Sequence, residues 1–279
     1  MAPDQNQPAV PLDQRSRLLR RRVVDMLKAG GRGHLAPAFS LIEIMRVLYD
    51  DILRYDAKNP QWKQRDRCIL SKGHGCMAWY VLLAEKGFFP AEELRKFCKD
   101  DGLLGGHPEV LIPGVEASTG SLGHGFSIGS GFALNAKYEK RNYRTFVIVG
   151  DGEINEGSTW EAALFCAKHQ LQNLCLIIDY NKHQSYASTA EVLPLEPLAD
   201  KFRSFGFGVA EVDGHDVQAL QKTFSSLPHT PNKPTAVICH TIKGKGIRFT
   251  ENNLQWHHKS KLSDAQFDQL YQGIESYPA

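Results

Sequence analysis

Several features that would assign this chain to a common class are missing from its sequence. No apolar run approaches the ~20 residues that a membrane-spanning helix needs. The N-terminus lacks the apolar segment of a signal peptide. The net charge is only +2, so no general electrostatic attraction to nucleic acid is expected. We therefore expect a cytoplasmic protein that binds neither membranes nor nucleic acids.

The cysteines exclude two further classes. No C-x-x-C pair occurs, and the spacing of cysteines and histidines fits no common zinc motif. Most cysteines lie within apolar segments and are expected to be small buried residues in a reducing compartment. The six are Cys68, Cys76, Cys98, Cys166, Cys175 and Cys239. Neither a disulfide framework nor a structural zinc site is therefore expected.

Two motifs of nucleotide-binding proteins are also absent. The sequence has neither the Walker spacing of a P-loop nor a G-x-G-x-x-G turn after a predicted strand. The segment Thr241-Ile-Lys-Gly-Lys-Gly246 shares only its composition with a phosphate-binding loop. A surface loop with two solvated lysines and a functional loop are both open interpretations of this segment.

Strand and helix patterns alternate along the chain. Short apolar runs predict strands at 67–70, 144–149, 174–178, 207–212 and 235–240, with helices between most of them. This alternation indicates an α/β fold with a mainly parallel sheet and helices on both faces. We find no internal repeat and no linker rich in proline or serine. A loose N-terminal segment over residues 1–12 and one domain over residues 13–279 are therefore expected.

Two helices are predicted near the N-terminus. One runs from Ser16 to Lys28, and five arginines lie in or beside it: Arg15, Arg17, Arg20, Arg21 and Arg22. A solvated helix face explains them better than a nucleic-acid patch, because no aromatic residues accompany them. The other helix is predicted to begin at Ser40, with Glu43 completing a capping box. The arginines are thus expected in solvent and Ser40 at a helix start.

The most specific pattern is Gly150-Asp151-Gly152, followed later by Asn181. Asp151 and Asn181 each follow a predicted buried strand, so both are expected at the carboxyl edge of the sheet, where α/β proteins bind ligands. Their oxygens suit Mg²⁺ or Ca²⁺, which substrate phosphates often help to coordinate. The backbone carbonyl of His183 could reach the same ion. Turn formation would explain either residue alone, but the pair favours a metal–diphosphate site.

Four histidines in glycine-bounded turns precede this pair: His34, His74, His107 and His124. Glycine leaves an imidazole open to close contact with a ligand. Imidazole can donate, accept or transfer a proton near neutral pH. A single histidine is usually structural, but four in such turns favour a shared role. His257 and His258 follow much later, and one of them could reach the same site.

Taken together, these blocks resemble the transketolase family of thiamine-diphosphate enzymes. The resemblance extends from about Gly31 to His257 and rests on five ordered blocks. They are Asp66–Gly75, Gly106–Glu109 with Gly114–Gly123, Gly150–Gly152 with Asn181, Asp213–Asp216 and Thr241–Gly246. Only the amino-terminal, diphosphate-binding domain of a transketolase is covered. The resemblance implies a thiamine-diphosphate-binding fold and the N-terminal subunit of a split, two-subunit transketolase.

Residue roles also follow from the resemblance. Asp151, Asn181 and the His183 carbonyl would hold Mg²⁺ or Ca²⁺. The cofactor thiamine diphosphate would contact His74, Gly120, Ser121, Leu122, Asp151, Gly152, Asn181 and His257. His34, His107 and His257 would be catalytic, facing the thiazolium carbon and the donor sugar. Glu156 would help to build the subunit interface. The sequence departs from the family pattern at three places: Leu35-Ala36 after His34, Ser121 in place of a common proline, and His258 in place of a glycine.

Such a subunit would transfer a two-carbon ketol unit from a ketose (phosphate) donor to an aldose (phosphate) acceptor. Its partner would be a C-terminal subunit that carries the pyrimidine-binding domain and the activating glutamate. Activity would need both subunits, and an α₂β₂ assembly is expected. Three alternatives remain open. They are a related thiamine enzyme with a non-standard sugar or pyruvate donor, as in 1-deoxyxylulose-phosphate synthase, a non-catalytic binding subunit, and a Mg²⁺-dependent phosphohydrolase with Asp151 as nucleophile.

Overall fold

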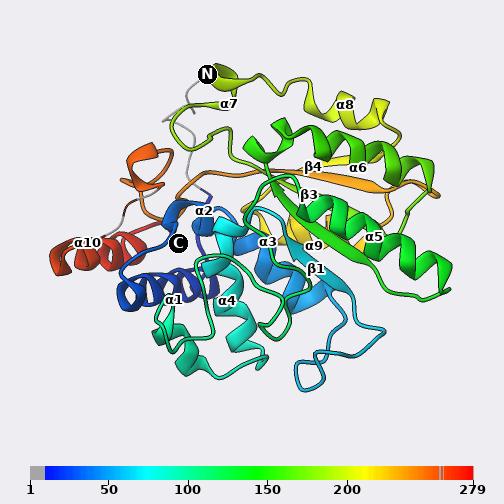
Figure 1. The fold of residues 1–279 in the computed structure, drawn as a ribbon. Coiled ribbons are helices and arrows are strands. Elements are labelled where there is room, and N and C mark those ends of the chain that lie inside the picture. Colours follow the sequence, from blue (N-terminus) through cyan, green and yellow to red (C-terminus); the bar gives the residue numbers. More distant parts are fainter. Residues whose placement is uncertain (1–9, 258, 260, 279) are drawn as a thin grey trace.

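A sheet of five parallel strands lies at the centre of the computed structural model, which describes residues 10–257, 259 and 261–278 (Figure 1). The strand order is β1-β2-β3-β5-β4, and every pairing is parallel. The strands are β1 (Arg67–Leu70), β2 (Thr145–Gly150), β3 (Leu174–Tyr180), β4 (Gly208–Asp213) and β5 (Thr235–His240). The predicted α/β fold with a mainly parallel sheet is confirmed.

Helices cover both faces of the sheet, which explains why its central strands are apolar throughout. Alternate residues of a strand point to opposite faces, so Ile148 and Ile177 join one core while Val147 and Leu176 join the other. The first core lies under α1 (Gln14–Gly30), α2 (Leu35–Phe39), α3 (Ile42–Val47), α4 (Cys76–Glu85), α9 (Val217–Ser225) and α10 (Asp264–Glu275). The second lies under α5 (Gly125–Tyr138), α6 (Gly157–Lys168) and α8 (Leu198–Ser204).

The order of the strands places a topological switch point, where α/β proteins bind ligands, at one edge of the sheet. The chain passes from β2 to β3 through α6 on one face. The chain leaves β3 toward α8 on this same face, whereas the chain that leaves β5, the neighbour of β3, leads to α10 on the opposite face. Connections that leave neighbouring strands toward opposite faces open a binding crevice at the carboxyl ends of those strands. The carboxyl ends of β3 and β5 meet this condition.

Short and irregular elements complete the described chain. A π-helical turn follows α3 (Leu48–Ile52), and 3₁₀ turns lie at η2 (Gly73–Gly75), η3 (Ala91–Lys96), η4 (Gly152–Asn155) and η5 (Leu254–Trp256), with a short α7 (Thr189–Val192). The segment η3, between α4 and α5, is thus a 3₁₀ turn and not an α-helix. Residues 100–124 contain no helix or strand, as the glycine-rich sequence indicates.

The capping-box prediction at Ser40 is wrong. Ser40 follows α2, and the residue before α3 is Leu41, whose side chain cannot cap. The hydroxyl of Ser40 instead donates to Asp179 Oδ2 at 2.7 Å. Glu43 forms an ion pair with Arg20. Because both side chains have partners deep in the fold, the local cap is not formed.

The expected solvated arginine face is also wrong for Arg20, which is completely buried. The other four arginines are more exposed but are held by partners rather than free in solvent. Arg15 and Arg22 both pair with Glu85, Arg21 pairs with Glu275, and Arg17 donates to carbonyls of the C-terminal segment. Helix α1 therefore ties together segments that are far apart in the sequence.

The ends of the described chain meet beside α1. Residues 1–9 of the predicted loose segment lie outside the described residues, but Leu12 is buried and its amide donates to the Pro278 carbonyl at 3.0 Å. All six cysteines are free thiols, and five of them are buried. In the part of the chain that the structure describes, no helix has both the length and the apolarity to cross a bilayer.

Candidate functional site

Asp151 and Asn181 lie at neighbouring strand ends, as predicted. Strand β2 ends at Gly150, which pairs in register with Asp179 near the end of β3. Asp151 accepts a hydrogen bond from the Gly152 amide at 2.7 Å and another from the Lys182 amide. Asn181 Oδ1 accepts from the His183 amide at 3.1 Å. Both side chains are buried, so their oxygens are held at the edge of the crevice.

A second buried acid, Asp179, collects side chains from three other segments. Its carboxylate accepts hydrogen bonds from Ser40, from Lys72 after β1 and from Thr241 after β5. Burial alone would raise the pKa of Asp179, but Lys72 and these hydrogen bonds outweigh burial and lower it. Asp179 is therefore a charged anchor that holds the segments around the crevice together.

Among the described residues, no lysine or arginine forms an ion pair with Asp151 as Lys72 does with Asp179. Burial, and then the neighbouring carboxylate of Asp179, raise the pKa of Asp151 to about 7. A cation at this carboxylate would remove that penalty. The ligand set of a carboxylate, the Asn181 amide and a backbone carbonyl consists of the hard oxygens that Mg²⁺ and Ca²⁺ prefer. The residues present thus fit a divalent ion.

Two lysines complete what we call the strand-end cluster: Lys72, Asp151, Asp179, Asn181 and Lys243. Lys243 is buried, and its Nζ donates to the carbonyls of His183 and Gln184 at 3.1 and 2.7 Å. Burial, and then Lys72, lower the pKa of Lys243 to about 8. The surface-loop interpretation of Thr241–Gly246 is wrong, because both of its lysines are buried against the fold.

Sequence reasoning assigned no role to Lys72 or Lys243. A signal was present, because each follows the end of a predicted strand and precedes a glycine. The cationic groups lie next to the buried carboxylates, where they would also attract a phosphate. They add the positive charge that a diphosphate site needs.

The histidine cluster consists of His34, His74, His107 and His257, from four separate segments. The ring centroid of His34 lies 5.6 Å from that of His74, 6.2 Å from that of His107 and 5.8 Å from that of His257. His74 and His257 are also 5.8 Å apart. Three of the four glycine-bounded histidines therefore come together with His257. The sequence predicted that His257 or His258 would reach this site. His257 does, whereas His258 lies outside the described residues.

The fourth glycine-bounded histidine, His124, faces its own turn instead. It is exposed, and its Nδ1 lies 3.2 Å from the carbonyls of Ser121 and Leu122. The shared role expected for the four histidines is thus supported for His34, His74 and His107 only.

The environment keeps two members of the histidine cluster uncharged at neutral pH. Burial, with further contributions from nearby Lys72 and His34, lowers the pKa of His74 well below its ordinary value. Burial and then Arg32 lower the pKa of His107. Neutral imidazoles can both donate and accept hydrogen bonds, which is what sugar hydroxyls require.

The glycine-rich turn at Gly120–Leu122 lies against the histidine cluster. A Cβ on Gly120 would come within 2.9 Å of the His107 ring, and the backbone there has φ +146. Ser121 is exposed and Leu122 is half-buried. Gly152, the other predicted contact, lies against Gln184, whose Cγ would be 3.1 Å from an added Cβ.

Glu153 fixes this turn to the sheet, a role that sequence reasoning missed. Its carboxylate accepts hydrogen bonds from the Gly123 amide at 2.9 Å, the Gly150 amide at 3.1 Å and the Ser71 hydroxyl. Three loops of the site therefore meet at one buried acid. The neighbouring Glu156 is exposed and lies beside the same turn.

Two other kinds of site are disfavoured. Among the described residues, no group of three or more His, Cys, Asp and Glu side chains is arranged to hold a metal, so the histidines do not form a zinc site. The letters of Gly125-Phe-Ser-Ile-Gly129 match the G-x-S-x-G spacing of hydrolases. They form the first turn of α5 and do not follow a strand, so they are not a nucleophile elbow.

Comparisons with known proteins agree with this geometry. Residues 13–277 match the family described as transketolase, thiamine diphosphate binding domain. The chain is 40% identical over 247 residues to one subunit of an apulose-4-phosphate transketolase from Phocaeicola vulgatus, covering 88% of each. It is 37% identical over 256 residues to a 6-deoxy-6-sulfo-D-fructose transketolase subunit of a Clostridium species, covering 91% of this chain and 93% of that subunit.

Solved structures show the same architecture. A transketolase from Campylobacter jejuni superposes with a TM-score of 0.87 at 28% identity, over 94% of this chain. The match covers 42% of that transketolase. The chain therefore spans less than half the length of that transketolase chain, whereas it spans most of the relatives that are named as transketolase subunits.

Proposed function

Because the chain belongs to the transketolase family, we propose that it is the diphosphate-binding subunit of a thiamine-diphosphate-dependent transketolase. The observation that carries this proposal is the position of the histidine cluster beside the strand-end cluster. Lys72 in the strand-end cluster is close enough to His74 in the histidine cluster to help lower the pKa of that imidazole. One site thus offers oxygens and cations for an ion-bound diphosphate, and neutral imidazoles for a sugar.

The strand-end cluster would hold the anionic end of the cofactor. Asp151, Asn181 and the His183 carbonyl would coordinate Mg²⁺ or Ca²⁺, and Gly152 would lie against the diphosphate. Lys72 and Lys243 would balance its remaining negative charge. The His183 carbonyl already accepts a hydrogen bond from Lys243 at 3.1 Å, so an ion bound there would compete with this contact.

The histidine cluster would act on the sugar. When bound, thiamine diphosphate supplies the thiazolium that makes two-carbon transfer possible. His74 and the Gly120–Leu122 turn would orient the cofactor. His34, His107 and His257 would hold the sugar hydroxyls and move protons to and from them, which is typical work for imidazoles near neutral pH.

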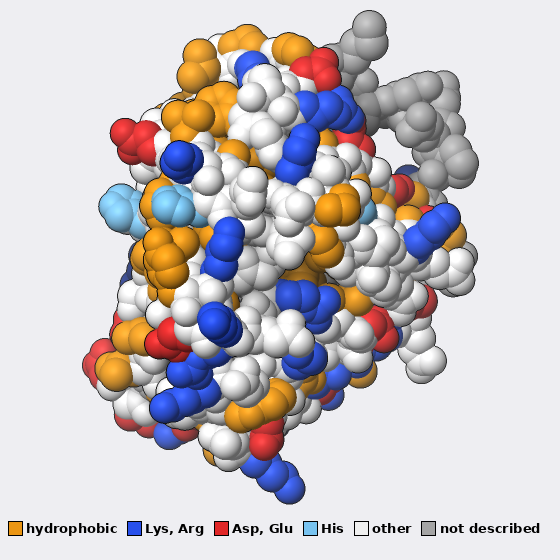
Figure 2. Space-filling view, turned by 90° about the vertical axis from the view of Figure 1, so that its right-hand side faces the viewer, with side chains coloured by type: hydrophobic (Ala, Val, Ile, Leu, Met, Phe, Trp, Pro, Cys, Tyr) orange, Lys and Arg blue, Asp and Glu red, His pale blue; other side chains and the backbone are white. Residues whose placement is uncertain are grey.

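A partner subunit would complete the site. Exposed apolar side chains on α5 and α6 support this, among them Ile128, Leu164 and Phe165. Figure 2 shows that hydrophobic side chains reach the surface in several places on the side of the molecule where α5 and α6 lie. We propose that the partner carries the pyrimidine-binding domain, that Glu156 lies at the interface, and that the assembly is α₂β₂.

Reconstitution tests this function directly. The chain would be combined with the C-terminal subunit encoded by a neighbouring reading frame, thiamine diphosphate and Mg²⁺, and ketol transfer would be followed by product analysis. We expect transfer only when all components are present. Failure to act on any ketose, in a complex that binds the cofactor, would favour the non-catalytic alternative.

The sugar itself needs a donor screen. The two relatives named above carry the names of different sugars at similar identity, so identity does not select between them. The screen would include phosphorylated, branched and sulfonated ketoses as well as pyruvate. Turnover of pyruvate would favour the 1-deoxyxylulose-phosphate-synthase type. Phosphate release without thiamine diphosphate would favour the phosphohydrolase.

A further inference from the structure

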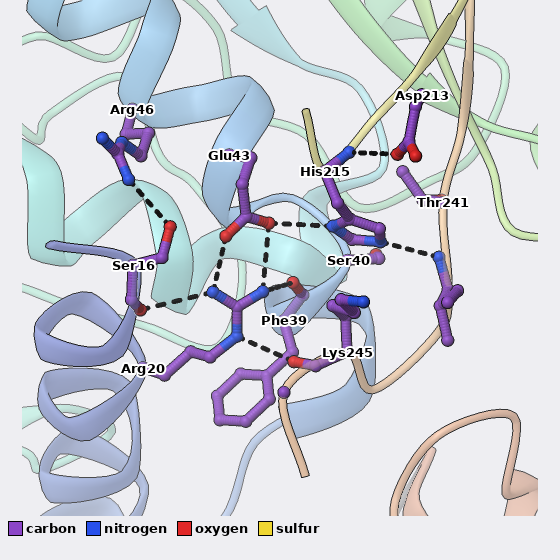
Figure 3. Close-up of polar contacts among 12 residues, drawn as sticks. Ser16, Arg20, Phe39, Ser40, Glu43, Arg46, Asp213, His215, Thr241 and Lys245 are labelled. Carbon is purple, nitrogen blue, oxygen red and sulfur yellow. Dashed lines mark hydrogen bonds and ion pairs between the residues drawn. The ribbon is translucent and has the colours of Figure 1, made fainter. Parts of the chain in front are cut away.

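A buried ionic network lies behind the Thr241–Gly246 loop and outside the residues proposed to contact the cofactor (Figure 3). Its centre is Glu43 on α3. Arg20 on α1 donates to both Glu43 oxygens, at 2.6 and 3.0 Å. His215, in the turn between β4 and α9, lies 2.9 Å from Glu43 through Nδ1. All three side chains are buried.

The network reaches the loop on both sides of Lys243. The amide of Ile242 donates to His215 Nε2 at 2.8 Å, and Arg20 Nε donates to the Lys245 carbonyl at 2.7 Å. The backbone that carries Lys243 is therefore held before and after this residue. Lys243 in turn directs its ammonium to the His183 and Gln184 carbonyls.

The hydrogen bonds define the tautomer of His215. An amide N–H can only donate, so Nε2 accepts, and the ring proton lies on Nδ1 facing Glu43. Burial alone would raise the pKa of Glu43, but Arg20 and His215 lower it, which keeps the carboxylate charged as an acceptor. The His215 backbone amide also donates to Asp213 Oδ1 at 2.8 Å, which fixes the turn.

We propose that His215 is a positioning residue for the diphosphate site. Glu43 orients the imidazole, the imidazole holds the Ile242 amide, and this contact keeps Lys243 directed at the crevice. The occupant of the crevice rests on the proposed function. The alternative is that the network only stabilises the core, with no specific effect on Lys243.

Two conservative variants separate the contacts of His215. In His215→Gln the side-chain oxygen can replace Nε2 as the acceptor for Ile242. In His215→Asn the amide group can replace only Nδ1, so the Ile242 contact is lost. His240→Gln is the matched control, because His240 on β5 also pairs with a glutamate, Glu211 on β4, at 2.9 Å, but its side chain is 42% exposed.

Hydrogen exchange on the full chain, without ligand, gives the first readout. We expect faster exchange in the 241–250 segment for His215→Asn, and exchange close to wild type for His215→Gln and His240→Gln. Equal exchange in all variants would overturn the proposal. So would a general increase across α1, α3 and this segment together, because that is the behaviour of a core contact.

Calorimetric titration with inorganic pyrophosphate and Mg²⁺ gives the second readout. We expect His215→Asn to weaken binding about 10-fold, as outer contacts of ligand-binding groups commonly do. In a Lys243→Met background the same change should cost less than about 2-fold, because the two residues act in series. Equal losses in both backgrounds would overturn the proposal. If wild type binds neither pyrophosphate nor thiamine diphosphate even with the partner subunit present, the proposed function fails, whatever the exchange data show.

Discussion

The strand-end cluster and the histidine cluster are held by different forces. In the strand-end cluster, buried charges are fixed by hydrogen bonds at the ends of paired strands. Asp179 alone accepts from three segments. In the histidine cluster, ring centroids from four segments lie 5.6 to 6.2 Å apart in edge-on or tilted contacts. The first depends on the sheet and the second on the course of loops.

Because of this difference, the two clusters should respond to different kinds of substitution. A change of charge should disturb the strand-end cluster most, because its carboxylates and ammonium groups are buried together. A change of backbone shape should disturb the histidine cluster most, because loops such as Gly120–Leu122 set the ring positions. The following substitutions test this contrast in order of expected effect.

Asp151→Asn should have the largest effect. It removes the only charged ligand proposed for the ion, so binding of thiamine diphosphate with Mg²⁺ should weaken about 100-fold or more. The free chain should unfold at the same or a higher temperature, because a buried carboxylate is removed. Calorimetry and thermal unfolding measure the two effects. Asp200→Asn, an exposed acid on α8, is the control. Unchanged cofactor affinity would contradict the ion site.

His107→Ala should reduce kcat for ketol transfer by about 100-fold, because a proton-transferring imidazole is lost. Cofactor affinity should change little. His74→Ala should show the reverse pattern, with weaker cofactor binding and a smaller fall in kcat. Steady-state kinetics of the reconstituted complex measure both. If the two variants behaved alike, the histidine cluster would act as a single binding surface.

Gly120→Ala should have an intermediate effect. The added Cβ would lie 2.9 Å from His107 Cδ2 at a backbone φ of +146, so the ring must shift. We expect kcat to fall about 10-fold, since small displacements of acid–base groups are costly, with a stability loss of about 1–2 kcal/mol. Gly131→Ala on α5 is the control, because nothing lies within 4 Å of its added Cβ. Normal activity in Gly120→Ala would show that the loop adapts.

Arg32→Gln should have the smallest effect and should not alter the fold. Arg32 disfavours the imidazolium of His107, so its removal should raise the pKa of His107 toward the ordinary value. The imidazolium would then persist to higher pH. Titration of the His107 ring by NMR measures the shift, and Arg95→Gln is the control, because Arg95 is exposed and does not contribute to the pKa shift of His107. A lower pKa of His107 would contradict the charge argument.

Local sequence patterns were sufficient to predict the sheet and the strand-end half of the candidate site. The apolar runs of β2 and β3 identify buried strands, and the parallel arrangement brings Asp151 and Asn181 to one edge. The convergence of His34, His107 and His257 could not be derived from spacing. It depends on how distant loops pack, and only the family resemblance implied it.

Contacts with residues far away in the sequence explain why the capping-box prediction at Ser40 was wrong. The pattern Ser-x-x-Glu forms a real capping box at Ser188, and Ser263 forms one with Gln266 at the start of α10. At Ser40 the same pattern fails, because Ser40 and Glu43 are needed by Asp179 and Arg20. Helix α10 itself was not predicted, although this box and the spacing of its buried apolar residues were available signals.

The hydrogen bond between the Leu12 amide and the Pro278 carbonyl brings the two ends of the described chain side by side. Since these residues are hydrogen-bonded neighbours beside α1, a short peptide could join them without stretching the fold. New ends could then be opened in the exposed turn between α9 and β5, which no cofactor contact is proposed to use. A circular permutant of this kind should assemble the same crevice. The site would then be a property of the packed segments and not of the order in which they are synthesised.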